Sequence, residues 1–115
     1  MIELMNKLLW STIEDYVGLW ELTWEVNSIL KSNNSSNKAL TKKILLNFLN
    51  AGLIKLYYNK WGDVPNKEIS LQEAIEVLES EEFWLAPKLN DLCVKISSTK
   101  KGEKYYNEDL ISDID

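Results

Sequence analysis

The sequence predicts an α+β domain that is mostly helical and contains a small antiparallel sheet of two or three strands. Apolar residues recur at helical spacing over residues 11–30 and 38–51. Residues 53–61 and 92–97 are instead rich in β-formers and alternate between apolar and polar side chains. We expect these two segments to be neighbouring strands. The predicted order is helix, helix, strand, helix, strand, helix, and a chain of 115 residues is long enough to fold as one domain around its own core.

The segment STIEDYVGLWELTWEVNSIL, residues 11–30, is predicted to be a central helix. On a helical wheel, its apolar residues cover well over half of the circumference, so the helix should have neighbours on more than one side. The remaining strip consists of Glu14, Gly18, Glu21, Glu25 and Ser28. Ser11 and Glu14 have the spacing of a capping box, which predicts that this helix begins anew after a short helix over residues 2–10.

The middle of the chain contains a loop, a helix and a strand. Residues 31–37 include no apolar side chain and predict an exposed loop. Residues 38–51 then have helical periodicity, and Gly52 stands where a left-handed cap would end the helix. The next residues, LIKLYYNKW, predict a strand to about Trp61, and residues 62–66 predict a turn.

A third helical pattern begins at Ser70, which forms a capping box with Glu73. Its apolar stripe is narrow, so we expect a surface helix over residues 70–80. Residues 81–91 contain a proline and are expected to be irregular, with their two aromatic side chains packing back onto the core.

The chain ends with a short helix and an acidic tail. Thr99 follows the second predicted strand and can cap a helix that runs to about residue 106. The tail from about residue 108 is acidic and is expected to fray.

Two segments resemble parts of a winged-helix domain. LLNFLNAGLIKLYY is similar to the end of that family's third helix running into the first wing strand, and CVKISSTKKGEKYY is similar to the second wing strand followed by a closing helix. Together they cover about a quarter of the chain. The resemblance implies a rearranged winged helix, because some thirty residues with a helix separate the strands, where a wing would be a short hairpin. Such a fold does not by itself imply DNA binding.

From the composition, we expect a protein of the bacterial cytoplasm. It has no apolar run approaching the roughly eighteen residues of a membrane span. Residues 1–10 lack the features of a signal peptide. The single Cys93 cannot form an internal disulfide, which fits a reducing compartment. Abundant Lys, Asn and Ile with no Arg are typical of an AT-rich genome.

The residue types present disfavour catalysis and cofactor binding. The sequence has no histidine, so it contains no Ser-His-Asp or Cys-His pair, and one cysteine cannot build a zinc site. Its four glycines are isolated, so no glycine-rich loop is expected to hold a phosphate. Cys93 lies within an alternating strand and is best interpreted as a small buried side chain. We therefore expect a protein that is not an enzyme and that uses no cofactor and no metal.

A nucleic-acid interface has some support on the second main helix. The residues on or beside this helix that could contact phosphate or bases are Lys38, Lys42, Lys43, Asn47, Asn50 and Lys55. Against this, arginine is absent and the net charge is −5, which repels a polyanion. The alternative, that these are solubilising residues on an exposed strip, is preferred, so nucleic acid is not the expected partner.

The acidic residues are less evenly distributed. Residues 1–62 carry seven Lys and five acids, a net +2, whereas residues 63–115 carry six Lys and thirteen acids, a net −7. Acids at a helix C-terminus oppose the helix dipole, so this arrangement suggests a binding surface rather than a gain in folding. The candidate partner-binding residues are Trp61, Asp63, Glu73, Glu76, Glu79, Glu81 and Glu82. The alternative is that an acidic helix only keeps a small protein in solution.

Two hypotheses about function follow. In the first, the chain is a non-enzymatic inhibitor that binds a basic protein. It resembles immunity proteins of contact-dependent growth inhibition systems in its size, its acidity and its lack of catalytic residues, which implies a nuclease-type toxin domain as the partner. The alternative is a winged-helix DNA-binding transcriptional regulator. The sequence leaves the identity of the partner and the oligomeric state open.

Overall fold

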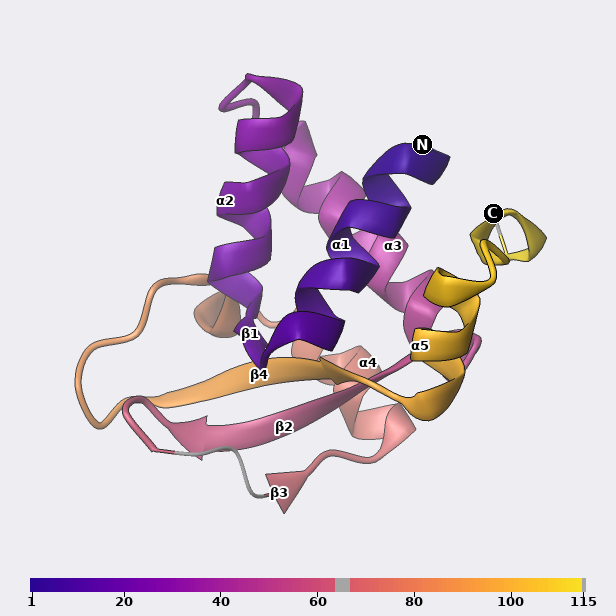
Figure 1. Ribbon diagram of the computed structural model, residues 1–115. Coiled ribbons are helices and arrows are strands. Elements are labelled where there is room, and N and C mark those ends of the chain that lie inside the picture. The colour runs from indigo at the N-terminus through magenta and orange to yellow at the C-terminus, as the bar shows by residue number, and fades with distance from the viewer. Residues whose placement is uncertain (64–66, 115) are drawn as a thin grey trace.

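Two strands form the centre of the sheet. In the computed structural model, which describes residues 1–63 and 67–114, β2 (Ile54–Lys60) and β4 (Leu92–Ser98) pair antiparallel along their whole length (Figure 1). Ile54 lies opposite Ser98, and Lys60 lies opposite Leu92. The predicted pairing of the two β-rich segments is therefore confirmed.

Two short strands lie at the edges of the sheet. β1 (Val17–Gly18) pairs with β4, and β3 (Lys67–Glu68) pairs with β2, which gives the antiparallel order β1-β4-β2-β3. The described part of the chain thus contains four strands, where the sequence predicts two or three. The reason is that strands of two residues are too short to produce a periodic pattern. Residues 64–66 of the expected turn lie outside the described residues.

The predicted central helix is interrupted, so its expected course over residues 11–30 is wrong. α1 (Ile2–Glu14) runs straight through Ser11, and α2 (Leu19–Leu30) begins only after β1. Ser11 therefore caps no helix. Its hydroxyl donates instead to the carboxylate of Glu25 on α2, with oxygen–oxygen distances of 2.8 and 2.6 Å.

The second helix begins at Gly18 because of two local interactions. The Gly18 N–H donates to the Glu21 carboxylate at 3.0 Å, which is one of the two hydrogen bonds of a capping box. The sequence predicts a capping box seven residues earlier, between Ser11 and Glu14. The indole of Trp20 also occupies the space beside Gly18, where a Cβ atom would lie 2.3 Å from the ring. Any larger residue at position 18 would displace that indole.

Three further α-helices are present in the described residues. They are α3 (Ser36–Asn50), α4 (Leu71–Glu79) and α5 (Lys100–Asn107). The Ser70 hydroxyl accepts a hydrogen bond from the N–H of Glu73 at 3.3 Å, and the Thr99 hydroxyl accepts one from Gly102 at 3.1 Å. Both predicted N-caps are therefore confirmed.

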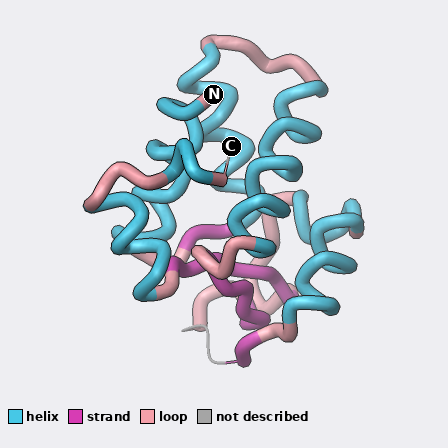
Figure 2. Tube along the Cα trace, turned by 90° about the vertical axis from the view of Figure 1, so that its right-hand side faces the viewer, coloured by secondary structure: helices cyan, strands magenta, loops and turns pink. Residues whose placement is uncertain are grey.

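The helices gather on one side of the sheet and leave its other side open (Figures 1 and 2). The core lies between these two layers. Its fully buried side chains include Leu8, Leu9, Leu22, Phe48, Leu56 and Ile96. None of the helices in residues 1–63 and 67–114 combines the length and apolar character that crossing a membrane requires.

α2 has the neighbours expected of a central helix but buries only part of its apolar surface. It contacts α1, α3, β1, β4 and a 3-10 helix, η1 (Glu81–Trp84). Trp20 is 3% exposed, whereas Trp24, one turn later, is 59% exposed. A helix with a wide apolar stripe thus places one tryptophan inside the protein and one on its surface.

The acidic tail, which was expected to fray, is described up to Ile114. It contains a second 3-10 helix, η2 (Ile111–Asp113), that packs on α1, and Ile111 is fully buried. The expectation of fraying rested on the charges of the tail. Burial of Ile111 removes apolar surface from water, which favours the packed position of this segment.

Replacement of Trp20 tests its position in the packing. We expect Trp20→Ala to lower the free energy of unfolding by about 3–5 kcal/mol, since a large aromatic side chain leaves a cavity. Trp24→Ala is the matched control and should change it by less than about 0.5 kcal/mol, because an exposed side chain loses little packing. Urea unfolding followed by circular dichroism measures both. Equal effects of the two substitutions would contradict this packing.

Gly102 tests the docking of α5. A Cβ at this position would lie 2.2 Å from the backbone carbonyl oxygen of Leu53, which cannot rotate away. We expect Gly102→Ala to destabilise the protein by about 1–3 kcal/mol, as overpacking does, despite the better helix propensity of alanine. Glu103→Ala, at an exposed site in the same helical turn, should be nearly neutral in the same unfolding measurement. A stabilised Gly102→Ala variant would show that α5 does not lie this close to Leu53.

Candidate functional site

Three of the predicted partner-binding residues gather around one tyrosine. The Tyr58 hydroxyl donates to the Glu73 carboxylate at 3.1 Å, and the Tyr58 ring packs against Phe83 with 5.9 Å between centroids. Burial raises the pKa of the Tyr58 phenol, and the hydrogen bond to Glu73 and the negative charges of Glu73, Glu76 and Glu82 raise it further. These three carboxylates, here called the acidic cluster, therefore share one electrostatic environment.

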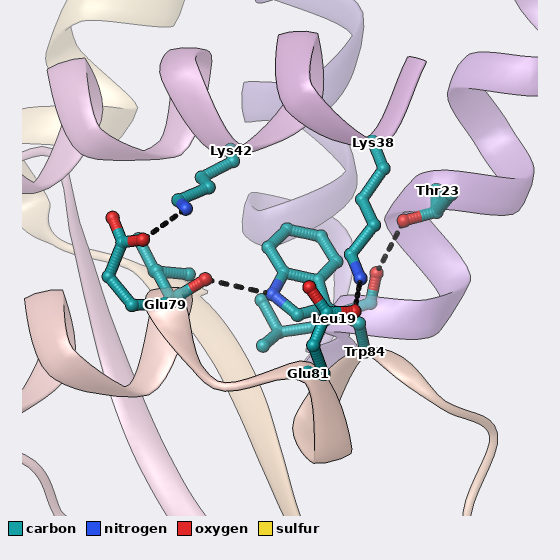
Figure 3. A network of polar contacts seen from close by, with 8 residues as sticks. Leu19, Thr23, Lys38, Lys42, Glu79, Glu81 and Trp84 are labelled. Atoms are coloured by element: carbon teal, nitrogen blue, oxygen red, sulfur yellow. Dashed lines mark hydrogen bonds and ion pairs between the residues drawn. The ribbon is translucent and has the colours of Figure 1, made fainter. Parts of the chain in front are cut away.

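The fold positions the acidic cluster through α4 and η1. α4 buries Ala74, Val77 and Leu78, so Glu73 and Glu76 are left on its exposed side. η1 returns the chain toward β2, where Phe83 packs against Tyr58 and the charge of Glu82 acts on the same phenol as those of Glu73 and Glu76. Its anchor is a buried tryptophan: the indole N–H of Trp84 donates to the carbonyl of Leu78 at 3.0 Å (Figure 3). The expected inward packing of the aromatic residues of this segment is thus confirmed for Trp84.

Two other predicted residues, Glu79 and Glu81, have a different role. Glu79 forms an ion pair with Lys42 and Glu81 with Lys38, both on α3 (Figure 3). The hydrogen bond and the charge of Lys38 lower the pKa of the Glu81 carboxyl. Glu79 and Glu81 thus have partners within the fold that the sequence pattern did not indicate, and they link α4 and η1 to α3. Exposed pairs of this kind are individually weak.

Trp61 and Asp63 do not join the acidic cluster. β2 ends at Lys60, and Trp61 lies in the turn that follows the strand. Trp61 packs edge-on against Trp20, with 5.4 Å between ring centroids, and the ammonium of Lys95 lies 4.9 Å from the Trp61 ring. Asp63 is exposed, and its backbone carbonyl accepts a hydrogen bond from the Asn59 amide at 3.0 Å.

The open side of the sheet carries aromatic residues whose association the sequence analysis missed. Tyr16 and Tyr57 meet edge to face there, with 5.5 Å between ring centroids. Tyr57 lies opposite Lys95 in the β2–β4 ladder, which places Lys95 and Trp61 on the same side. The alternating pattern of β2 indicates which of its residues share one side of the sheet. It does not indicate which residues of β4 lie beside them, because that depends on the register of the two strands.

The candidate DNA-contacting residues are divided between two places. On α3, Lys38 and Lys42 pair with acids, while Lys43 and Asn50 are exposed and Asn47 is half-buried. Lys55 lies instead on β2 and pairs with Glu68 across the β2–β3 edge at 3.1 Å. The helix predicted to contact nucleic acid therefore faces an acidic segment along part of its length.

The described residues offer little for nucleophilic or metal chemistry. Cys93 is buried, its thiol lies 3.3 Å from the Asn59 side-chain oxygen, and burial raises its pKa. A thiol of this kind stays protonated at neutral pH and is a weak nucleophile. No group of three or more acidic or sulfur side chains in residues 1–63 and 67–114 has the arrangement of a metal site.

The grouping of carboxylates around Tyr58 can be tested by titration. We expect Glu73→Gln to lower the Tyr58 pKa toward 10.0, because it removes a negative charge that opposes phenolate formation. The pKa of Tyr58 is higher in the folded protein than in the unfolded chain, so the folded state is favoured while the phenol is protonated. This contribution to stability is lost as the pH rises above 10 and the phenol ionises. Wild type should therefore lose stability above pH 10 more steeply than the variant, whose pKa is raised less. Tyrosine ring carbon shifts in NMR measure the pKa, and Glu103→Gln is the control. An unchanged Tyr58 pKa in Glu73→Gln would contradict the observed contact.

Comparison with known proteins does not assign this fold or this surface. No protein family, curated protein or solved structure matches the chain.

Proposed function

We propose that this chain is a non-enzymatic protein-binding domain that inhibits a basic partner, in the manner of a bacterial immunity protein that neutralises a nuclease-type toxin. One observation carries the proposal. Glu73 accepts a hydrogen bond from Tyr58, and Glu76 and Glu82 lie close enough for their charges to raise the pKa of the Tyr58 phenol. No ion pair within the described residues joins these three carboxylates to a lysine. Their charge is therefore available to a partner.

The chemistry of the acidic cluster suits a nuclease surface. A nuclease binds a polyanion, so its substrate site is positively charged. Carboxylates held on the rigid frame of α4 and η1 can pair with lysine or arginine side chains there, and they steer the approach of the two proteins. Tyr58 and Phe83 add half-buried aromatic surface beside the charges, and aromatic residues supply much of the binding energy in protein interfaces.

The proposal places the protein in the bacterial cytoplasm, where it would meet an incoming toxin. We also propose that the architecture is related to a winged helix. The pairing of β2 with β4 and the Thr99-capped helix that follows β4 support this part of the proposal. DNA regulation is disfavoured, because the ion pairs of Lys38 and Lys42 with Glu81 and Glu79 offset the positive charge of α3.

Charge reversal tests the proposed interface. We expect the double variant Glu76→Lys/Glu82→Lys to keep the fold, since both side chains are exposed and neither forms an ion pair within the described residues. The partner is first captured from the native cell with wild-type protein and tested for a nuclease or toxic activity that wild type suppresses. Association with this partner should then slow by about tenfold or more at low salt, because exposed charges act mainly on the on-rate.

The matched control is Glu103→Lys/Glu108→Lys on and after α5, which changes the net charge equally at another exposed place. The on-rate of the control should fall much less than that of the cluster variant. Equal slowing of both variants would show that only net charge matters. An unchanged on-rate in the cluster variant at low ionic strength would place the interface elsewhere.

A further inference from the structure

A second candidate site is lined by residues of α1, α2 and α5, and none of its lining residues belongs to α4. It is an open pocket of about 530 Å³. Its lining residues are Ile2, Glu3, Asn6, Lys7, Trp10, Glu25 and Tyr106. The helical spacing on α1 brings its five lining residues to one face.

An aromatic pair lines one part of this pocket. Trp10 is 44% exposed and stacks on Tyr106, with 5.3 Å between ring centroids and 28° between ring planes. Stacking fixes the orientation of the indole, so it offers a flat aromatic surface to solvent. Such a surface attracts planar groups and, through its quadrupole, cations.

The polar groups of the pocket have more hydrogen-bond acceptors than donors. The Ser11 hydroxyl approaches both oxygens of the Glu25 carboxylate, but its single proton leaves that carboxylate with acceptor capacity. The side-chain oxygen of Asn6 is buried and has no hydrogen-bond partner among the described residues. The charge of Lys7 is offset by Glu3, at 3.4 Å. The lining therefore carries a net charge of −1, from two acids and one lysine.

We propose that this pocket binds a planar organic cation with several N–H donors, namely an amidinium or a guanidinium group. The flat cation stacks on Trp10, and its N–H groups donate to the carboxylate of Glu25. A guanidinium fits a carboxylate better than an ammonium does, because it presents parallel N–H donors in one plane. The inference is independent of the acidic cluster and uses none of its residues.

Three compounds of nearly identical shape test the proposal. Benzamidine is a cation, benzamide is neutral and benzoate is an anion, and their binding is followed by NMR through the Trp10 indole N–H and the Asn6 backbone amide. We expect saturable benzamidine binding with a Kd of about 1–10 mM, a reasonable range for a small fragment. Benzamide should bind at least about fivefold more weakly, since it lacks the charge-assisted contact. Benzoate should not bind.

Variants separate this site from the acidic cluster. Glu25→Gln keeps a side chain that can accept from Ser11, and it should abolish the preference for benzamidine over benzamide. Glu103→Gln is the matched control and should retain that preference. Glu76→Lys/Glu82→Lys should also bind benzamidine normally, so failure of this proposal and failure of the protein-binding proposal are distinguishable.

The source of the cation is addressed by two further ligands. Agmatine carries a guanidinium on a free small molecule, whereas acetyl-arginine-amide presents it as a peptide side chain. Tighter binding of one of them identifies the source that the pocket prefers. Equal affinity for benzamidine and benzamide, or an unchanged preference in Glu25→Gln, would overturn the proposal.

Discussion

The antiparallel pairing of β2 with β4 is the constraint on which the other features of this protein depend. Its register places Leu56 and Ile96 under the helices, and Tyr57 and Lys95 on the open side of the sheet. A slip of one residue would exchange the two sides of one strand and bury polar groups in the core. The same ladder also provides the partners for both edge strands, and therefore decides where α2 begins.

The acidic cluster is a consequence of how the chain connects these two strands. The connection contains β3, α4 and η1, and it is held against α3 by two ion pairs and by the buried Trp84. This arrangement brings both Glu76 and Glu82 within range of Tyr58, although η1 follows α4 through an extended residue. The carboxylates thus lie on a packed frame, and a partner would not have to order a mobile segment before it could bind them.

Charge in this protein is distributed differently in space than along the chain. The first half of the sequence is slightly basic and the second half strongly acidic, but Lys38 and Lys42 neutralise acids that come some forty residues later. Two groups of carboxylates lie beside aromatic side chains, one at the acidic cluster and one at the pocket that contains Trp10 and Glu25. Negative charge beside an aromatic ring attracts cationic groups with a flat or apolar body.

The sequence by itself determined the elements whose signals are local. The caps at Ser70 and Thr99, the helix up to Asn50 and the two long strands each depend on residues within a few positions of one another. The tertiary structure decided the rest. The apolar residues of segment 11–30 have helical spacing whether or not the helix is interrupted. The interruption arises because β1 pairs with the distant strand β4 and because Trp20 packs over Gly18. The ion pairs of Glu79 and Glu81 likewise join elements whose proximity no local pattern encodes.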